Sequence, residues 1–186
     1  MREHPRNKIL AKENNMASPT LQPPVLLTFG NIPAQMCAQA ASAGSRSLVL
    51  LQPIDHTGQT TLQQWQFGSD GRIYLNTPGL NTPGAPASLC LTYQGEPENG
   101  EPLGIAATDP TDPTQVWQWI NNQTSLQNMG ASQSGTAFVI DNSAGSTSPG
   151  NRIQIWAFFN NGNQIWVAQA VPSSQFGGIS AKVTAA

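Results

Sequence analysis

Apolar residues in this chain occur in short runs, separated by turns that contain glycine or proline. No window of about a dozen residues keeps the i, i+3, i+4 apolar spacing of a helix without an interrupting Pro or Gly. Strands spaced at roughly 8–12 residues are typical of β-sandwiches and β-barrels. We therefore predict an all-β fold, with strands at Val25–Phe29, Ser47–Leu51, Trp65–Phe67, Arg72–Leu75, Leu89–Tyr93, Leu103–Ala106, Val116–Ile120, Thr136–Ile140, Arg152–Phe158 and Gln164–Ala168.

The tripeptide Gln-x-Trp occurs three times at nearly constant spacing. Its copies are Gln63-Gln64-Trp65, Gln115-Val116-Trp117 and Gln164-Ile165-Trp166. The tryptophans lie 52 and 49 residues apart (117−65 and 166−117), and Cys37, Cys90 and Val139 precede the three motifs at matching distances. A repeat of this length marks one structural unit, and three four-stranded units can close their edges as a barrel. We predict repeats at about 25–67, 68–119 and 120–171.

The two ends of the chain differ from this repeated body. Residues 1–24 are expected to form a flexible leader and residues 172–186 a C-terminal tail. The N-terminus lacks the apolar segment of a secretory signal, and no apolar run approaches the ~18 residues of a membrane span. The sequence therefore predicts no membrane insertion and leaves the compartment open between the cytoplasm and non-classical secretion. Apolar residues in the tail suggest packing on the body or on a second copy, so a homodimer is one hypothesis.

Charged residues are scarce, at 10% of the 186 residues against roughly 25% in an average soluble domain. Beyond residue 13 the chain holds 4 basic groups (8−4) and 8 acidic groups (10−2), a net charge of −4. No basic stripe remains to neutralise phosphates, which argues against a nucleic-acid partner. Polar character comes instead from 18 Gln and 15 Asn, and such a surface favours a neutral ligand.

The repeated Gln and Trp are assigned a structural role. Because the two residues are separated by one position on a strand, their side chains point the same way. The indole of Trp65, Trp117 or Trp166 buries a large apolar ring, while the glutamine satisfies backbone groups at a strand crossing. We expect all three tryptophans in the core.

Catalytic and metal sites have little support in the sequence. Cys37 and Cys90 are expected to be buried free thiols, with a single disulfide as the alternative. Cys37 and His56 would make a nominal nucleophile and base, but Cys37 shares its repeat position with Cys90. The acidic stretches 96–101 and 109–112 have irregular spacing and are interrupted by prolines, which is typical of solvated loops rather than of a calcium site. We expect no enzyme, no metal and no cofactor.

Three in-phase Gln-x-Trp repeats of about 50 residues resemble the ricin B-chain-like (R-type) lectins. The resemblance covers roughly residues 25–171, most of the chain. It implies a β-trefoil with pseudo-threefold symmetry. It also implies binding of sugars, commonly galactose or N-acetylgalactosamine, through up to three sites with one in each repeat.

The third repeat matches the sugar-binding pattern of that family. Asp141 is followed thirteen residues later by Gln154, then by Trp156 and the pair Asn163-Gln164. By resemblance, Asp141, Gln154 and Asn163 would contact sugar hydroxyls, Trp156 would stack on the ring, and Gln164 would brace the site from behind. The chemistry suits a hexose, because a carboxylate holds two hydroxyls, an amide donates to a third, and an indole covers the C–H face.

The first two repeats depart from this pattern. Thr92, Gly104, Ala106 and Thr114 stand at the four positions in the second repeat, and the first repeat has Gln39 and Leu62 with neither Gln nor Trp in 48–51. Both lack the carboxylate and the aromatic residue. The sequence therefore predicts one sugar site per chain, in the third repeat.

Other interpretations of the same residues remain open at this point. Asp141 could be a turn residue beside Asn142, and Trp156 could belong to the core. Some similar trefoils inhibit proteases through a loop, and the Pro/Gly-rich loops 76–88 and 94–102 are candidates for that role. A stand-alone lectin and the delivery subunit of a toxin are not distinguished by the sequence.

Overall fold

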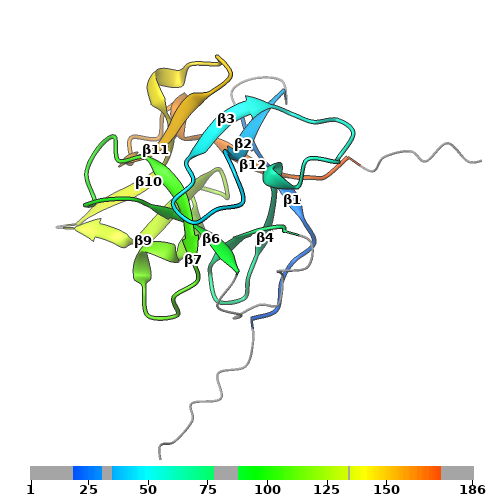
Figure 1. The fold of residues 1–186 in the computed structure, drawn as a ribbon. Helices are drawn as coiled ribbons and strands as arrows, with labels where there is room; N and C mark the ends of the chain where they lie inside the picture. Colours follow the sequence, from blue (N-terminus) through cyan, green and yellow to red (C-terminus); the bar gives the residue numbers. More distant parts are fainter. Residues whose placement is uncertain (1–18, 31–34, 78–87, 134, 173–186) are drawn as a thin grey trace, which may run out of the picture.

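The computed structural model describes residues 19–30, 35–77, 88–133 and 135–172 (Figure 1). Twelve strands account for nearly all of the regular structure: β1 Val25–Phe29, β2 Met36–Ala40, β3 Val49–Pro53, β4 Gln64–Phe67, β5 Ile73–Leu75, β6 Leu89–Tyr93, β7 Leu103–Ala107, β8 Trp117–Ile120, β9 Ser125–Gln133, β10 Thr136–Asn142, β11 Asn151–Ala157 and β12 Trp166–Ala170. The helices in these ranges are four single 3₁₀ turns: η1 Thr61–Gln63, η2 Pro113–Gln115, η3 Ser143–Gly145 and η4 Gly162–Gln164. No helix in the described ranges is long and apolar enough to cross a membrane.

Six of the strands form a barrel. Strand β1 pairs with both β4 and β12, β4 pairs with β5, and β8 pairs with β9, all antiparallel. In the second repeat, the bridge Arg72↔Val116 connects the chain just before β5 with the chain just before β8. In the third repeat, the N–H of Trp166 on β12 donates to the carbonyl of Thr124, just before β9, at 2.8 Å. Closure leaves these strands without an open edge.

The other six strands form three hairpins, β2–β3, β6–β7 and β10–β11, one in each repeat. The hairpins meet one another pairwise above one end of the barrel, where β3 pairs with β11 and the bridges Leu48↔Gly104 and Pro102↔Gln154 complete the triangle. A six-stranded barrel capped by three hairpins is the β-trefoil, as the repeated sequence predicts. The three repeats comprise β1–β4, β5–β8 and β9–β12.

All ten strands expected from the sequence are present, with small shifts at their ends. Two further strands, β2 and β9, were not expected. The residues of β2 are buried at every position except Gln39, so they show no alternation. Strand β9 contains polar residues and a glycine, Gly130, and its register with β10 shifts at a bulge. Neither strand carries the alternating pattern that identifies a half-buried strand.

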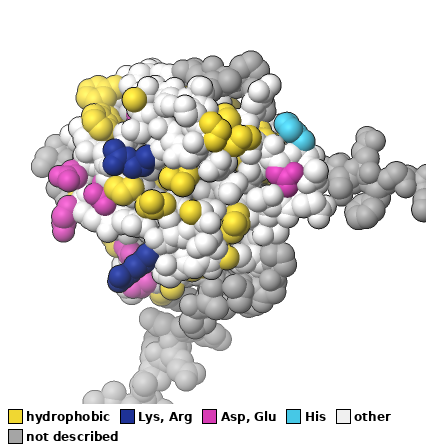
Figure 2. All heavy atoms as spheres, turned by 45° about the horizontal axis from the view of Figure 1, so that its top comes forward, with side chains coloured by type: hydrophobic (Ala, Val, Ile, Leu, Met, Phe, Trp, Pro, Cys, Tyr) yellow, Lys and Arg dark blue, Asp and Glu magenta, His cyan; other side chains and the backbone are white. Residues whose placement is uncertain are grey.

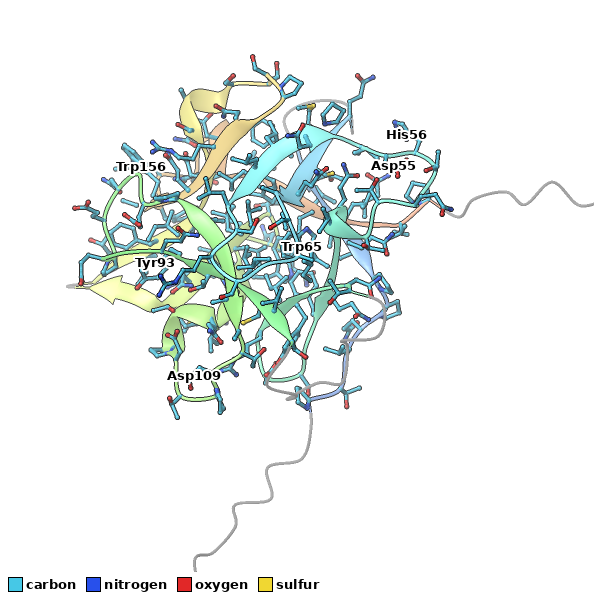
Figure 3. The ribbon with its side chains drawn as sticks, in the orientation of Figure 1. Asp55, His56, Trp65, Tyr93, Asp109 and Trp156 are labelled. Atoms are coloured by element: carbon cyan, nitrogen blue, oxygen red, sulfur yellow. The ribbon has the colours of Figure 1, made fainter. Side chains whose placement is uncertain are left out.

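The Gln-x-Trp motif joins barrel and hairpin identically in each repeat. The indole N–H groups of Trp65, Trp117 and Trp166 donate to the carbonyls of Ala38, Leu91 and Ile140, at 3.0, 2.9 and 3.2 Å respectively. The three rings are buried in one core that fills the barrel, and Figure 3 shows Trp65 near the centre of the molecule. The core position expected for these tryptophans is confirmed.

Each motif glutamine holds the chain just beyond its hairpin. Gln63 accepts from the N–H of Asp55 and donates to the carbonyl of Pro53, both at 2.8 Å. Gln115 accepts from Asp109 N–H and donates to Ala107 carbonyl, both at 2.9 Å. Because these amides bond backbone groups that no strand partner reaches, they fix the exit of each hairpin.

Residues at both ends of the body contact it. Within the expected leader, residues 19–24 are described, and the Leu21↔Gly68 bridge is flanked by hydrogen bonds between Gln22 N–H and Phe67 carbonyl and between Ser69 N–H and Thr20 carbonyl. This part of the leader is thus attached to the barrel, because its backbone pairs with the turn after β4. At the other end, Val171 packs on a small cluster that includes Leu26 and Ile54. The remainder of the leader and of the tail lies outside the described residues.

We predict that Gln115→Leu destabilises the fold by about 2 kcal/mol, because it removes the buried side chain that bonds both the Asp109 N–H and the Ala107 carbonyl. Urea unfolding measures this change in the free energy of unfolding. Gln118→Leu, at an exposed position of β8, is the matched control and should change it by less than about 0.5 kcal/mol. Equal effects of the two substitutions would show that the repeated glutamine has no structural role.

Candidate functional site

The hairpin of the third repeat places an acid, an amide and an indole on one face. Asp141 on β10 lies directly opposite Gln154 on β11. Along β11, Arg152, Gln154 and Trp156 alternate with two isoleucines that are fully buried in the core. Because successive strand residues point to opposite faces, the three alternating residues share the face that looks away from the barrel.

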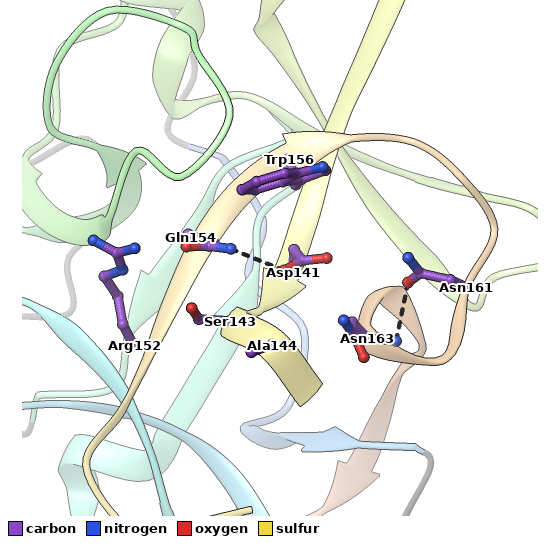
Figure 4. A pocket seen from close by; sticks show the side chains of 8 residues that line it. All are labelled: Asp141, Ser143, Ala144, Arg152, Gln154, Trp156, Asn161 and Asn163. Carbon is purple, nitrogen blue, oxygen red and sulfur yellow. Dashed lines mark hydrogen bonds between the residues drawn. The ribbon is translucent and has the colours of Figure 1, made fainter. Parts of the chain in front are cut away.

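These side chains surround a hollow of about 380 Å³. Figure 4 shows Trp156 along one side of it and Asp141 and Gln154 at its back, with Asn161 and Asn163 on the side opposite Arg152. Of the residues that the sequence assigned to a sugar site, four line this pocket: Asp141, Gln154, Trp156 and Asn163. The fifth, Gln164, lies behind it. The structure also brings Ser143, Ala144, Arg152 and Asn161 to the wall, none of which the sequence singled out.

Asp141 and Gln154 form a buried polar pair at the back of the pocket. The side-chain amide of Gln154 donates to Oδ1 of Asp141 at 3.1 Å, and the two residues are 4% and 3% exposed. Oε1 of Gln154 is buried and has no hydrogen-bond partner among the described residues. A buried acceptor without a donor is costly, so this oxygen is poised to accept a hydrogen bond from a bound molecule.

Asn163 reaches the pocket from the turn η4. Oδ1 of Asn161 accepts from the N–H of Asn163 at 3.0 Å, which caps this turn and orients the asparagine (Figure 4). Gly145 in η3 makes room for the side chain, since a Cβ there would lie 2.5 Å from Oδ1 of Asn163. Gly145 also has a φ of +64°, which favours glycine. A side chain at position 145 would therefore strain the turn η3 and displace the Asn163 amide from its place at the pocket.

The third Gln-x-Trp motif supports the pocket from the core side. Gln164 donates to the carbonyl of Ala157 at 2.8 Å, directly after Trp156, and accepts from the N–H of Phe159 at 2.9 Å. Trp166 bonds the carbonyl of Ile140, directly before Asp141. The motif thus fixes the backbone next to both the acid and the indole.

Burial raises the pKa of the Asp141 carboxyl above its ordinary value of 3.8. Hydrogen bonds from the amides of Gln154 and Gln164 favour the ionised form and oppose this effect, but burial is the larger influence. Asp141 is the only acid in the third repeat, so no neighbouring carboxylate of that repeat contributes. The carboxylate gains from any ligand that donates hydrogen bonds to it.

In the corresponding regions of the other two repeats, side chains contact one another. In the second repeat the hydroxyls of Thr92 and Thr114 bond each other at 3.0 Å, and the Gln94 side chain lies over Gly104, where a Cβ would clash with it. In the first, the Gln63 amide donates to Oε1 of Gln39 at 2.8 Å. Neither region has an indole at the position of Trp156.

Both cysteines are free and fully buried, as expected from the sequence. Burial raises the pKa of the Cys37 thiol to about 12, and the nearby Asp55 adds to this shift. Because the thiolate is the nucleophilic form of cysteine, this shift argues against Cys37 as a nucleophile. His56 lies on an exposed turn at the rim of the molecule, next to Asp55 (Figure 3).

The loop 94–102 lies along the outer edge of β11 rather than extending into solvent. The N–H of Gly100 donates to the carbonyl of Ile155 at 3.0 Å, and the N–H of Ile155 donates to the carbonyl of Glu101 at 2.8 Å. This second-repeat segment therefore adjoins the third-repeat pocket. The second candidate loop for protease inhibition is 76–88. It lies mostly outside the described residues.

The fold and the pocket on the third-repeat hairpin place this chain in the class of β-trefoil proteins with a hairpin-borne site. The model of the ricin-type beta-trefoil lectin domain matches residues 28–166, and the chain belongs to this family. No curated protein matches it by sequence.

Solved structures similar to this one are also trefoils. They include the C-half of an earthworm R-type lectin (TM-score 0.59, 13% identity, covering 80% of this chain and 98% of that one). The β-trefoil lectin of the Vibrio vulnificus hemolysin/cytolysin has a TM-score of 0.60 and 12% identity, and covers 80% and 95%. The designed threefold-symmetric protein ThreeFoil has a TM-score of 0.59 and 15% identity, and covers 78% and 97%. At these levels of sequence identity, the similarity shows a shared fold alone.

We predict that Asp141→Asn raises the melting temperature of the sugar-free protein at pH 7. Since the pKa of Asp141 is raised in the folded state, its ionised form costs stability, and this cost appears as the pH rises above about 3.8. The difference between variant and wild type should therefore shrink as the pH falls toward that value. Thermal unfolding between pH 3.5 and 8 measures it, and a variant that is less stable at pH 7 would contradict a net cost of burying this carboxylate.

Proposed function

We propose that this protein is a lectin that binds galactose- or N-acetylgalactosamine-type glycans in the third-repeat pocket. The observation that carries the proposal is the buried Asp141–Gln154 pair, with its unpartnered Oε1, beside the half-exposed indole of Trp156. A buried carboxylate and an orphan acceptor require donors, and a partly exposed indole favours contact with an apolar surface. A hexose offers both, hydroxyls on one side and C–H groups on the other.

Each pocket residue then has a distinct chemical role. Asp141 accepts hydrogen bonds from two neighbouring hydroxyls, and the orphan oxygen of Gln154 accepts from another. Asn163 supplies an amide donor for a hydroxyl oxygen, and Trp156 covers the C–H face of the ring. Gln164 contacts no sugar but holds the strand end beside Trp156.

The ligand class is supported by family membership and by the surface. The earthworm lectin half was solved with GalNAc and the Vibrio trefoil with N-acetyl-D-lactosamine, and both ligands contain a galactose-type residue. Figure 2 shows a face on which only scattered side chains carry charge. Such a surface suits a neutral sugar better than a phosphorylated partner.

We expect one sugar per chain, because the first two repeats lack the carboxylate and the indole and their equivalent side chains contact one another. Isothermal titration with N-acetylgalactosamine should give a stoichiometry close to one. A value near three would show that the other repeats bind as well. One weak site per chain gains avidity only in an assembly, so agglutination by this protein would require a homodimer or a multivalent carrier.

The central test is the affinity of Asp141→Asn for galactose and N-acetylgalactosamine. We expect at least a tenfold loss, because a neutral amide cannot accept two hydroxyl bonds with charge assistance. Asp109→Asn changes an exposed carboxylate on a second-repeat turn, far from Trp156 in Figure 3, and should bind like wild type. The proposal fails if wild type binds no glycan on an array, or if the Asp141 variant binds as well as wild type.

A further inference from the structure

The site strand β11 receives a contact from the second repeat that the other two repeats lack. Where the hairpins meet, a residue with positive φ donates its N–H to the neighbouring hairpin: Arg46 to Ile105, Gly100 to Ile155 and Gly150 to Leu51, at 2.7, 3.0 and 2.8 Å. These three backbone contacts follow the pseudo-threefold symmetry. They belong to the architecture and carry no information about the site.

The residue before each of these positions breaks the symmetry. Oδ1 of Asn99 accepts from the N–H of Ala157 at 2.7 Å, across 58 residues of sequence. At the equivalent junctions stand Ser45, whose side chain makes no hydrogen bond to another described residue, and Pro149, which has no side-chain acceptor. The residue equivalent to Ala157 at the Pro149 junction is Pro53, which has no N–H. Asn99 thus adds a hydrogen bond only at the one hairpin that carries the pocket.

This bond acts on the indole that lines the pocket. Trp156 is flanked by Ile155, which exchanges two backbone bonds with Gly100 and Glu101, and by Ala157, which Asn99 holds. The loop also lies against the ring, since a Cβ at Gly100 would be 3.7 Å from Cζ3 of Trp156. Gln164, from the third repeat, holds the carbonyl of the same residue, Ala157. The backbone just after the indole is therefore held by side chains from two different repeats.

We propose that Asn99 is a positioning residue for Trp156, so that the third-repeat site is completed by the second repeat. This rests on the proposed sugar-binding function. An indole held at a fixed angle stacks on a sugar without first losing conformational freedom, and such preorganisation increases affinity. Asn99 touches no sugar in this scheme and acts only through the strand end.

Affinity for N-acetylgalactosamine should fall about fivefold in Asn99→Ala, the equivalent of one net hydrogen bond. Asn99→Asp keeps an acceptor oxygen and should restore most of the wild-type affinity. Ser45→Ala, at the pseudo-symmetric position without this bond, is the matched control and should bind like wild type. Unchanged affinity in Asn99→Ala, or equal losses in Asn99→Ala and Ser45→Ala, would overturn the proposal.

A second readout needs no sugar. In the free protein, Asn99→Ala should speed hydrogen exchange of the Ala157 amide and shift the indole N–H resonance of Trp156, and Asn99→Asp should reverse both changes. If wild type binds no glycan, the proposed function fails, and these signals still decide whether Asn99 positions Trp156. Signals that are unchanged in Asn99→Ala would overturn the positioning role in either case.

Discussion

The fold depends on one interaction repeated three times: an indole N–H in the barrel donates to a backbone carbonyl of a hairpin. Each hairpin also contacts the barrel through apolar packing, and the first two through single backbone pairings, Thr28↔Cys37 and Tyr74↔Cys90. The hydrogen bond is directional and lies inside a closed core, where an unpaired donor or acceptor is costly. The partner glutamine, two residues earlier, fixes the end of the same hairpin. Together the tryptophan and the glutamine fix how each hairpin is placed on the barrel.

In the third repeat the same motif also supports the pocket. Trp166 bonds the residue before Asp141, and Gln164 bonds the residue after Trp156. The architecture therefore fixes the backbone at these positions in every repeat, and only the outward side chains differ. In the third repeat an acid and an indole line a pocket, whereas the Thr92–Thr114 pair and the Gln63–Gln39 pair bond each other in the other two repeats. The scaffold thus supports different side chains at equivalent positions, and the candidate site lies in the third repeat.

The sequence predicts the features that recur with a period. The spacing of the Gln-x-Trp motifs identifies the trefoil and the core tryptophans, and the thirteen-residue interval from Asp141 to Gln154 corresponds to two directly opposed strand residues. Features without a period are not predicted: β2 and β9 lack alternation, and Asn99 contacts a residue 58 positions away. Arg152 could have been found, because it alternates with Gln154 and Trp156 on one strand, and strand alternation puts all three on one face.

The repeat period also distinguishes the tryptophans. Those of the Gln-x-Trp motif recur once in each repeat and are structural, whereas Trp156 occurs only in the third repeat and is partly exposed. Trp65, Trp117 and Trp166 are buried and bonded, Trp119 packs on Phe67, and Trp156 lines the pocket. The most direct measurement is a titration of ¹⁵N-labelled protein with galactose, followed through the five indole N–H resonances. We predict that the Trp156 resonance shifts with saturable dependence on sugar while those of Trp65 and Trp117 stay in place. Saturable shifts confined to tryptophans other than Trp156, or no shift at any sugar concentration, would contradict a sugar site in the third repeat.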